Sequence, residues 1–221
     1  MTMKITFLSH ACFLLEDGKH SLLIDPYLTG NPLAAAKPEE LSPDFIAVTH
    51  AHGDHLGDTA AIAKRCGSTI FAVAELARTL RGECLTVSDG NLGGSQPTAF
   101  GRLKYVPACH GSGIAGGLAC GLLVEMDGKK IYHAGDTALI SDMTLLREEK
   151  IDLALLPIGD YYTMGPEDAL RAAEMIRPGM TIPMHYDTFP VIRQDPEAFH
   201  AAAQKRGLPV RVMAPGESFV L

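Results

Sequence analysis

The segment His50-Ala51-His52-Gly53-Asp54-His55 places four side chains of metal-ligand type within six residues. It directly follows an apolar run, residues 45–48, that is typical of a buried strand. Side chains alternate along an extended chain, so His50 and His52 point to the same side, while Gly53 lets the backbone bend beyond them. Burying histidines and carboxylates together without a partner is costly, because each must be desolvated. The segment therefore predicts a metal site rather than a solvated polar loop.

Three further residues of ligand type end apolar runs later in the chain. His110 follows the run at 104–108, Asp136 follows the run at 131–134, and His185 ends the run at 181–184. Taken alone, His110 and His185 would be interpreted as structural histidines held by hydrogen bonds, and Asp136 as a turn residue. Together with the first segment, and in this order, they complete two sets of metal ligands.

The elements that must position these residues are short strands and a few helices. The patterns predict strands at Lys4–Leu8, Ala11–Glu16, Ser21–Asp25, Phe45–Val48, Thr69–Val73, Cys84–Val87, Leu153–Leu156 and Thr181–Met184, and helices at Asp58–Arg65, Glu75–Arg81, from Gly165 and from Asp195 to Gly207. Asp127-Gly128 between apolar runs predicts a hairpin. Two strand-rich halves with helices attached indicate two sheets packed face to face, with helices outside, in one domain over residues 1–221.

Composition narrows the functional classes. The chain has 221 residues, 47% of them hydrophobic, and a formal net charge of −7. With no run of Lys or Arg, this acidic balance disfavours binding to a nucleic-acid backbone. No apolar stretch is long enough to span a bilayer, so we expect no membrane association. The five cysteines are widely spaced without a Cys-x-x-Cys, which predicts reduced thiols and a cytoplasmic location.

The sequence resembles the metallo-β-lactamase superfamily over essentially its whole length. Within that superfamily it is most similar to a family of small metal-dependent hydrolases related to the ascorbate-phosphate lactonases. The residues that carry the resemblance are Ser9 to Leu14, Ile24 to Pro32, His50 to His55, Tyr132 to Thr137, Leu155 to Asp160, Thr163 to Glu167 and His185-Tyr186. The resemblance implies an α/β fold that is a four-layer αββα sandwich, with two mixed β-sheets packed face to face.

The resemblance also implies how the ligands are shared between two divalent ions. One ion would be held by His50, His52 and His110, and the other by Asp54, His55 and His185, with Asp136 bridging both. Cys109 precedes His110 rather than replacing it, which weighs against a β-lactamase. Gly111 to Gly113 and Asp187 depart from the family pattern, where a serine-rich stretch and an asparagine are usual, and they concern substrate contacts rather than metals.

The ligand set predicts hydrolytic chemistry. Nitrogen and oxygen ligands without a thiolate favour Zn²⁺, with Mn²⁺, Fe²⁺ and Ni²⁺ as alternatives. The hypothesis is that a hydroxide shared by the two ions attacks the carbonyl or phosphoryl centre of a small lactone or phosphoester. Asp54 is the candidate catalytic residue, which would orient the nucleophile and pass a proton to the leaving group.

Other polar residues have less defined roles. His10 and Tyr186 are candidates for substrate binding, against the alternatives of a capped structural histidine and a packed aromatic. Asp25 is a candidate hydrogen-bond partner for a ligand histidine, as such sites generally need. Of the remaining histidines, His20, His133 and His200 are interpreted as incidental.

Two alternative functions remain at this point. A nuclease on the same fold would need salt-sensitive binding to nucleic acid, and a non-catalytic metal-binding protein would retain metal without turnover. An iron-dependent redox role is a weaker third possibility. The resemblance further implies assembly into a homo-oligomer.

Overall fold

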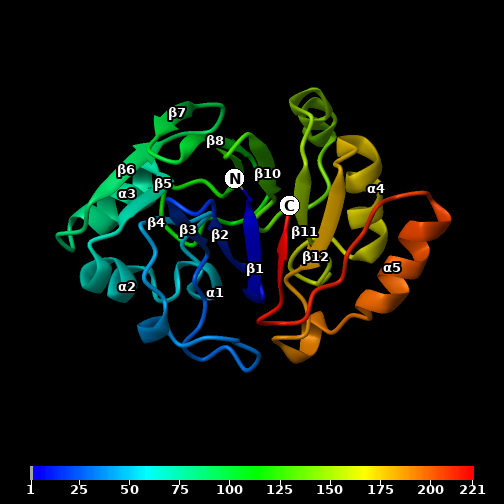
Figure 1. Ribbon diagram of the computed structural model, residues 1–221, viewed down its shortest axis with the longest axis horizontal. Helices are drawn as coiled ribbons and strands as arrows, with labels where there is room; N and C mark the ends of the chain where they lie inside the picture. Colours follow the sequence, from blue (N-terminus) through cyan, green and yellow to red (C-terminus); the bar gives the residue numbers. More distant parts are fainter. Residues whose placement is uncertain (1) are drawn as a thin grey trace.

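The computed structural model describes residues 2–221, which form two mixed β-sheets packed face to face with helices on the outside (Figure 1). The first sheet has seven strands in the order β13-β1-β2-β3-β4-β5-β6. Their bounds are β13 (Ser218–Val220), β1 (Lys4–Ser9), β2 (Cys12–Glu16), β3 (Ser21–Ile24), β4 (Phe45–Ala47), β5 (Thr69–Val73) and β6 (Val87–Gly90). The predicted αββα sandwich is confirmed.

The second sheet has six strands in the order β12-β11-β10-β9-β8-β7. Their bounds are β12 (Met180–Met184), β11 (Leu153–Pro157), β10 (Lys129–His133), β9 (Cys120–Met126), β8 (Gly101–Pro107) and β7 (Ser95–Thr98). The predicted hairpin joins β9 to β10, with positive φ at Asp127 (49°) and Gly128 (75°). Two consecutive positive φ values give the turn whose twist matches that of paired antiparallel strands.

The helices cover the outer faces of the sheets, α2 and α3 on one side of the molecule and α4 and α5 on the other (Figure 1). Their bounds are α1 (Gly53–Leu56), α2 (Thr59–Cys66), α3 (Ala74–Arg81), α4 (Pro166–Ile176) and α5 (Pro196–Lys205), with 3₁₀ segments η1 (Pro38–Glu40), η2 (Ser141–Glu149) and η3 (Pro190–Ile192). The Asp195 side chain accepts hydrogen bonds from the backbone N–H groups of Glu197 and Ala198, so it caps α5 as the sequence predicts.

The prediction of a strand at Cys84–Val87 was wrong. The strand runs from Val87 to Gly90, and Cys84 lies in a turn with a φ of 61° and a backbone hydrogen bond to Arg81. A φ near 60° does not fit the extended backbone of a strand, so the chain turns at Cys84 after α3 before it becomes extended. The other predicted strand bounds differ from the observed ones by only a few residues.

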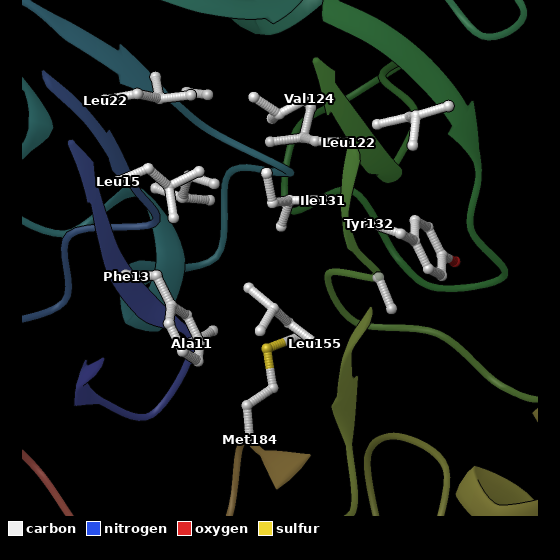
Figure 2. Close-up of a cluster of buried hydrophobic side chains, with 14 of the residues drawn as sticks. Ala11, Phe13, Leu15, Leu22, Leu122, Val124, Ile131, Tyr132, Leu155 and Met184 are labelled. Atoms are coloured by element: carbon white, nitrogen blue, oxygen red, sulfur yellow. The ribbon is translucent and has the colours of Figure 1, made fainter. Parts of the chain in front are cut away.

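The core lies between the two sheets (Figure 2). Phe13 and Leu15 of the first sheet face Ile131 and Leu155 of the second, and all four are fully buried. Burying a side chain of this size contributes about 1.5–3 kcal/mol relative to leaving it exposed. The packed sheets therefore give the loops at their edges a rigid base.

Strand direction brings the loops of both sheets to a common edge. β1, β3 and β4 run in the same direction because β1 and β3 are each antiparallel to β2 and β4 is parallel to β3. The same reasoning aligns β8, β10, β11 and β12 in the second sheet. Every candidate ligand follows the carboxyl end of one of these aligned strands, which is where sites on such sheets are built.

Candidate metal centre

The segment after β4 starts the centre. His50 follows the strand in an extended loop, and His52 precedes α1, a single turn that carries Asp54 and His55. His50, His52 and His110 offer ligand atoms that all lie within 4.8 Å of one another. The closest pair, His50 Nε2 and His52 Nδ1, is 2.9 Å apart. The structure therefore brings together the first predicted ligand set.

A second group contains His10, Asp54, His55 and His185, whose ligand atoms also lie within 4.8 Å of one another. Asp54 Oδ2 is 3.8 Å from His185 Nε2 and 3.3 Å from His10 Nε2. The prediction placed Asp54, His55 and His185 together. The structure adds His10, which follows β1 with its backbone in the left-handed region.

Asp136 lies between the two groups. Its Oδ1 is 3.1 Å from His55 Nε2, and its Oδ2 is 3.2 Å from His185 Nε2 and 3.4 Å from His110 Nε2. Asp136 is only 3% exposed. A carboxylate with each oxygen next to different imidazoles has the position expected of a bridging ligand.

The unpaired atoms of this cluster fit metal ions. The Nε2 atoms of His10, His55 and His185 and Oδ1 of Asp136 are buried and make no hydrogen bond. A buried polar atom left without a partner costs about 1–3 kcal/mol. Imidazole nitrogens and carboxylate oxygens are the donors that Zn²⁺, Mn²⁺, Fe²⁺ and Ni²⁺ accept. The residues present therefore fit the divalent ions that the sequence predicts.

Outer partners fix the orientation of two of the imidazoles. His55 Nδ1 donates to Asp25 Oδ2 at 2.7 Å, and the Thr49 hydroxyl donates to the same oxygen at 2.6 Å. Thr49 Oγ1 in turn lies 3.0 Å from His50 Nδ1, in position to accept its proton. Both histidines then direct Nε2 toward the centre, and the ring with Nε2 unprotonated is the form that binds a metal. The predicted role of Asp25 agrees with these contacts.

Burial and neighbouring charges set the protonation of the cluster. Burial lowers the pKa of His50 to about 3, which keeps its ring neutral, and it lowers that of His110 as well. Burial acts in the same direction on His55, but the carboxylates of Asp136 and Asp25 outweigh it and raise that pKa well above its ordinary value. The proton held between two carboxylates is one that a metal cation displaces on binding.

Three site residues have a backbone in the left-handed region. The φ angles are 57° at His10, 45° at Asp25 and 57° at His185. Each residue directly follows a strand, and the turn at that point directs its side chain toward the centre. A hydrogen bond of 2.9 Å from the His185 N–H to the His10 carbonyl oxygen joins two of these turns across the sheets.

A cleft of about 570 Å³ opens onto the cluster. Its lining includes residues of ligand type, His52, Asp54, His110, Asp136 and His185, and a second group of aromatic and aliphatic residues, Tyr27, Tyr162, Phe189 and Val191. The sequence prediction missed the second group. Tyr27 lies in a segment quoted for the family resemblance, and Tyr162 lies in an exposed aromatic pair with Tyr161, but neither signal indicates which way a loop side chain faces.

The two residues predicted to bind substrate, His10 and Tyr186, do not line the cleft. His10 is 1% exposed and lies behind Asp54, with its Nδ1 only 2.6 Å from Thr188 Oγ1. Tyr186 packs against the hydrophobic core, and burial raises the pKa of its phenol to about 12. Neither is among the residues that line the cleft within the described part of the chain.

The remaining histidines make local or structural hydrogen bonds. His20 lies beside Asp17, and His200 beside Gln204. His133 is fully buried, and its Nε2 donates to the carbonyl oxygen of Ala11 at 2.8 Å, which links the two sheets. Within residues 2–221, no helix is long and apolar enough to cross a membrane.

Comparison with known proteins agrees with this geometry. The model of the beta-lactamase superfamily domain matches residues 20–186. A UPF0173 metal-dependent hydrolase from Symbiobacterium thermophilum is 51% identical, over 99% of this chain and 100% of the relative. Another from Thermus thermophilus is 49% identical, over 97% of each chain.

A solved structure agrees as well. Igni18, a metallo hydrolase from the archaeon Ignicoccus hospitalis, superposes with a TM-score of 0.94 at 37% identity, covering 100% of this chain and 99% of that one. The fold, the clustered donors and these relatives lead to one assignment. The chain belongs to the beta-lactamase superfamily and, within it, to the UPF0173 metal-dependent hydrolases.

Proposed function

We propose that the protein hydrolyses a lactone or a phosphoester of a small molecule at a centre that holds two divalent cations. The observation that carries the proposal is the convergence of imidazole and carboxylate donors from both sheets at the floor of one cleft. A structural metal site needs no access from solvent, whereas a catalytic one keeps an open position. The cleft supplies that access.

In this proposal His50, His52 and His110 hold one cation, and Asp54, His55 and His185 hold the other. Asp136 lies between them, and the contacts of its two oxygens with histidines of both sets support a shared role. When bound, two such cations supply Lewis acidity toward a carbonyl or phosphoryl oxygen and lower the pKa of water to roughly 7.

Asp54 is the residue proposed to move the proton. Its side chain is 25% exposed and lines the cleft, so it can reach both an attacking water and a leaving group. Burial disfavours its charge, but the neighbouring His10 and His55 rings hold the pKa of the carboxyl well below its ordinary value. The carboxylate is therefore ionised and can hold an attacking water by accepting its hydrogen bond, and in this proposal it passes the proton of that water to the departing oxygen. His10, only 3.3 Å away, positions it.

Metal analysis joined to a substrate panel tests the proposal. The purified protein is assayed on lactones, carboxylic esters, and phosphate mono- and diesters, before and after chelation and after readdition of Zn²⁺ or Mn²⁺. We expect at least one class to be hydrolysed, the rate to vanish on chelation and to return with metal. His50→Ala should lose metal and turnover, whereas His200→Ala, at a partly exposed histidine of α5, should keep both. Undiminished hydrolysis by metal-free protein would falsify the proposal.

The cysteines support a reducing compartment, and we propose the cytoplasm. Cys12 and Cys120 are buried as free thiols, and no cysteine of the described residues is paired. Burial raises the pKa of both thiols, which makes them poor nucleophiles. Titration of five free thiols in freshly lysed cells would agree with this location, and an intact disulfide would contradict it.

A further inference from the structure

Part of the cleft lining, which we call the wall, consists of aromatic and aliphatic side chains. It consists of Tyr27, Tyr162, Phe189 and Val191, from the loops after β3, β11 and β12. Tyr162 is 55% exposed and Val191 is 49% exposed, so large apolar surface faces solvent at the cleft mouth. Apolar side chains gathered at the mouth of a cleft, rather than scattered singly, indicate a binding surface.

Ring contacts with His10 hold Tyr27 and Phe189 of the wall in place. The rings of Tyr27 and Phe189 are nearly parallel, at 28° and 6.2 Å between centroids, and both lie 5.5 Å from the His10 ring. The Tyr27 hydroxyl donates to the Gly30 carbonyl oxygen at 3.1 Å. Because this hydroxyl is already paired, Tyr27 offers ring surface to a ligand rather than a hydrogen-bond donor.

The charge of the cleft lining also favours an apolar ligand. Among the described residues, no Lys or Arg lines it, while Asp54 and Asp136 both do. Cations bound at the centre would interact with the reacting group of a substrate, but no cationic side chain along the wall would pair with a second anionic group. A charged tail on this wall would lose its hydration without gaining a partner, whereas an apolar tail would gain contact.

We propose that the wall selects substrates whose group beyond the reacting bond is apolar and uncharged, so the substrate class is a neutral carboxylic ester or lactone with an aryl or alkyl group. This rests on the proposed function. In the reaction, a water oxygen bonds to the carbonyl carbon and the acyl C–O bond breaks. One water proton reaches the leaving oxygen and the other stays with the new acid; an ester gives an acid and an alcohol or phenol, and a lactone gives a single hydroxy acid.

A matched pair of substrates tests the inference. 4-Nitrophenyl hexanoate and the mono-4-nitrophenyl ester of adipic acid have the same chain length, but the second ends in a carboxylate. We expect kcat/KM to favour the hexanoate by about 10-fold or more, within the range that apolar pockets discriminate. Val191→Lys should reduce this ratio about 10-fold, mainly through KM and with unchanged metal content. Leu145→Lys, at a side chain 72% exposed and outside this cleft, is the control.

A binding measurement separates this inference from the proposed function. 4-Nitrophenyl hexyl ether is uncharged and cannot be hydrolysed at an acyl bond, and 6-(4-nitrophenoxy)hexanoate is its charged counterpart. Calorimetric titration should show tighter binding of the ether, weakened in Phe189→Ala. If no class of the substrate panel is hydrolysed but the ether still binds better, the proposed function fails and the apolar specificity stands. Equal binding of the two ethers, or preferred turnover of the adipate ester, overturns the specificity.

Discussion

Asp25 accepts a hydrogen bond from His55 Nδ1 at 2.7 Å, and both side chains are fully buried. Asp25 comes from the end of β3, and His55 from the single turn α1, thirty residues further on. Burial opposes the charge of Asp25, but the His55 ring holds the pKa of its carboxyl below the ordinary value. The pair fixes which nitrogen of His55 faces the centre.

Replacement of Asp25 should therefore weaken metal binding without removing a ligand. Asp25→Asn keeps the size of the side chain but loses the charge that orients His55. We expect metal affinity to fall about 10- to 100-fold, as for other partners of ligand histidines. Chelator competition measures it. Asp44→Asn, at a carboxylate that pairs with Ser21 instead, should leave the affinity unchanged.

Thr188 should matter for the centre although it lies behind His10. Its Oγ1 is 2.6 Å from His10 Nδ1, and His10 Nε2 faces Asp54. In Thr188→Val the ring loses this partner, so Asp54 becomes less well oriented. We expect kcat to drop several-fold at unchanged KM, with a smaller loss of metal affinity than in His10→Ala. Thr144→Val, whose hydroxyl bonds only to the Ser141 carbonyl oxygen among the contacts described, is the control, and equal effects of both valines would contradict a positioning role.

Metal binding should raise the thermal stability of the whole chain. The donors come from loops of both sheets, so unfolding either sheet separates them. A metal at 100 times its Kd stabilises the folded state by about 2.7 kcal/mol. For a chain of this length that corresponds to a rise in Tm of roughly 5–10 °C. Thermal denaturation with chelator and with Zn²⁺ measures the shift, which His110→Ala should abolish and His200→Ala should retain.

Asp17 should contribute stability that depends on pH. Burial raises its pKa, but the backbone N–H groups of Lys19 and His20, at 2.8 and 2.6 Å, outweigh it and lower the pKa below the ordinary value. A carboxyl with a lowered folded-state pKa stabilises above its unfolded pKa of about 3.9 and loses this effect as pH falls through the folded value. The difference in free energy of unfolding between wild type and Asp17→Asn should therefore shrink from pH 5 to pH 3. Urea titrations at several pH values test this, and a constant difference would argue against it.

The sequence predicts the fold and the donors because both have local signatures. His50 to His55 is a dense cluster that follows a buried strand, and alternating apolar patterns place His110, Asp136 and His185 at strand ends. Aligned strands then bring these ends to one edge, so the residues named from sequence lie together in the structure. The hairpin at Asp127-Gly128 and the helix from Pro166 were predictable for the same reason.

The cleft wall was not predictable in this way. Tyr27, Phe189 and Val191 lie in loops, where no periodicity indicates which side chains face inward. His10 is adjacent to Asp54 because β1 and β4 lie in one sheet, which is a contact between distant segments. At Cys84 the local pattern gave a wrong prediction. Its apolar surroundings favour a strand, but the turn after α3 requires a positive φ. These features depend on tertiary packing, which a local pattern does not contain.

The left-handed backbone at His10, Asp25 and His185 implies a trade between stability and activity. For a residue with a Cβ this conformation costs about 1 kcal/mol of folding free energy, whereas glycine adopts it without that cost. Replacing His10 or His185 by Gly should thus be less harmful to folding than replacing it by Ala, although either change removes an imidazole. Selection for folding alone would favour glycine at these positions, so a histidine is expected there when its imidazole serves the centre.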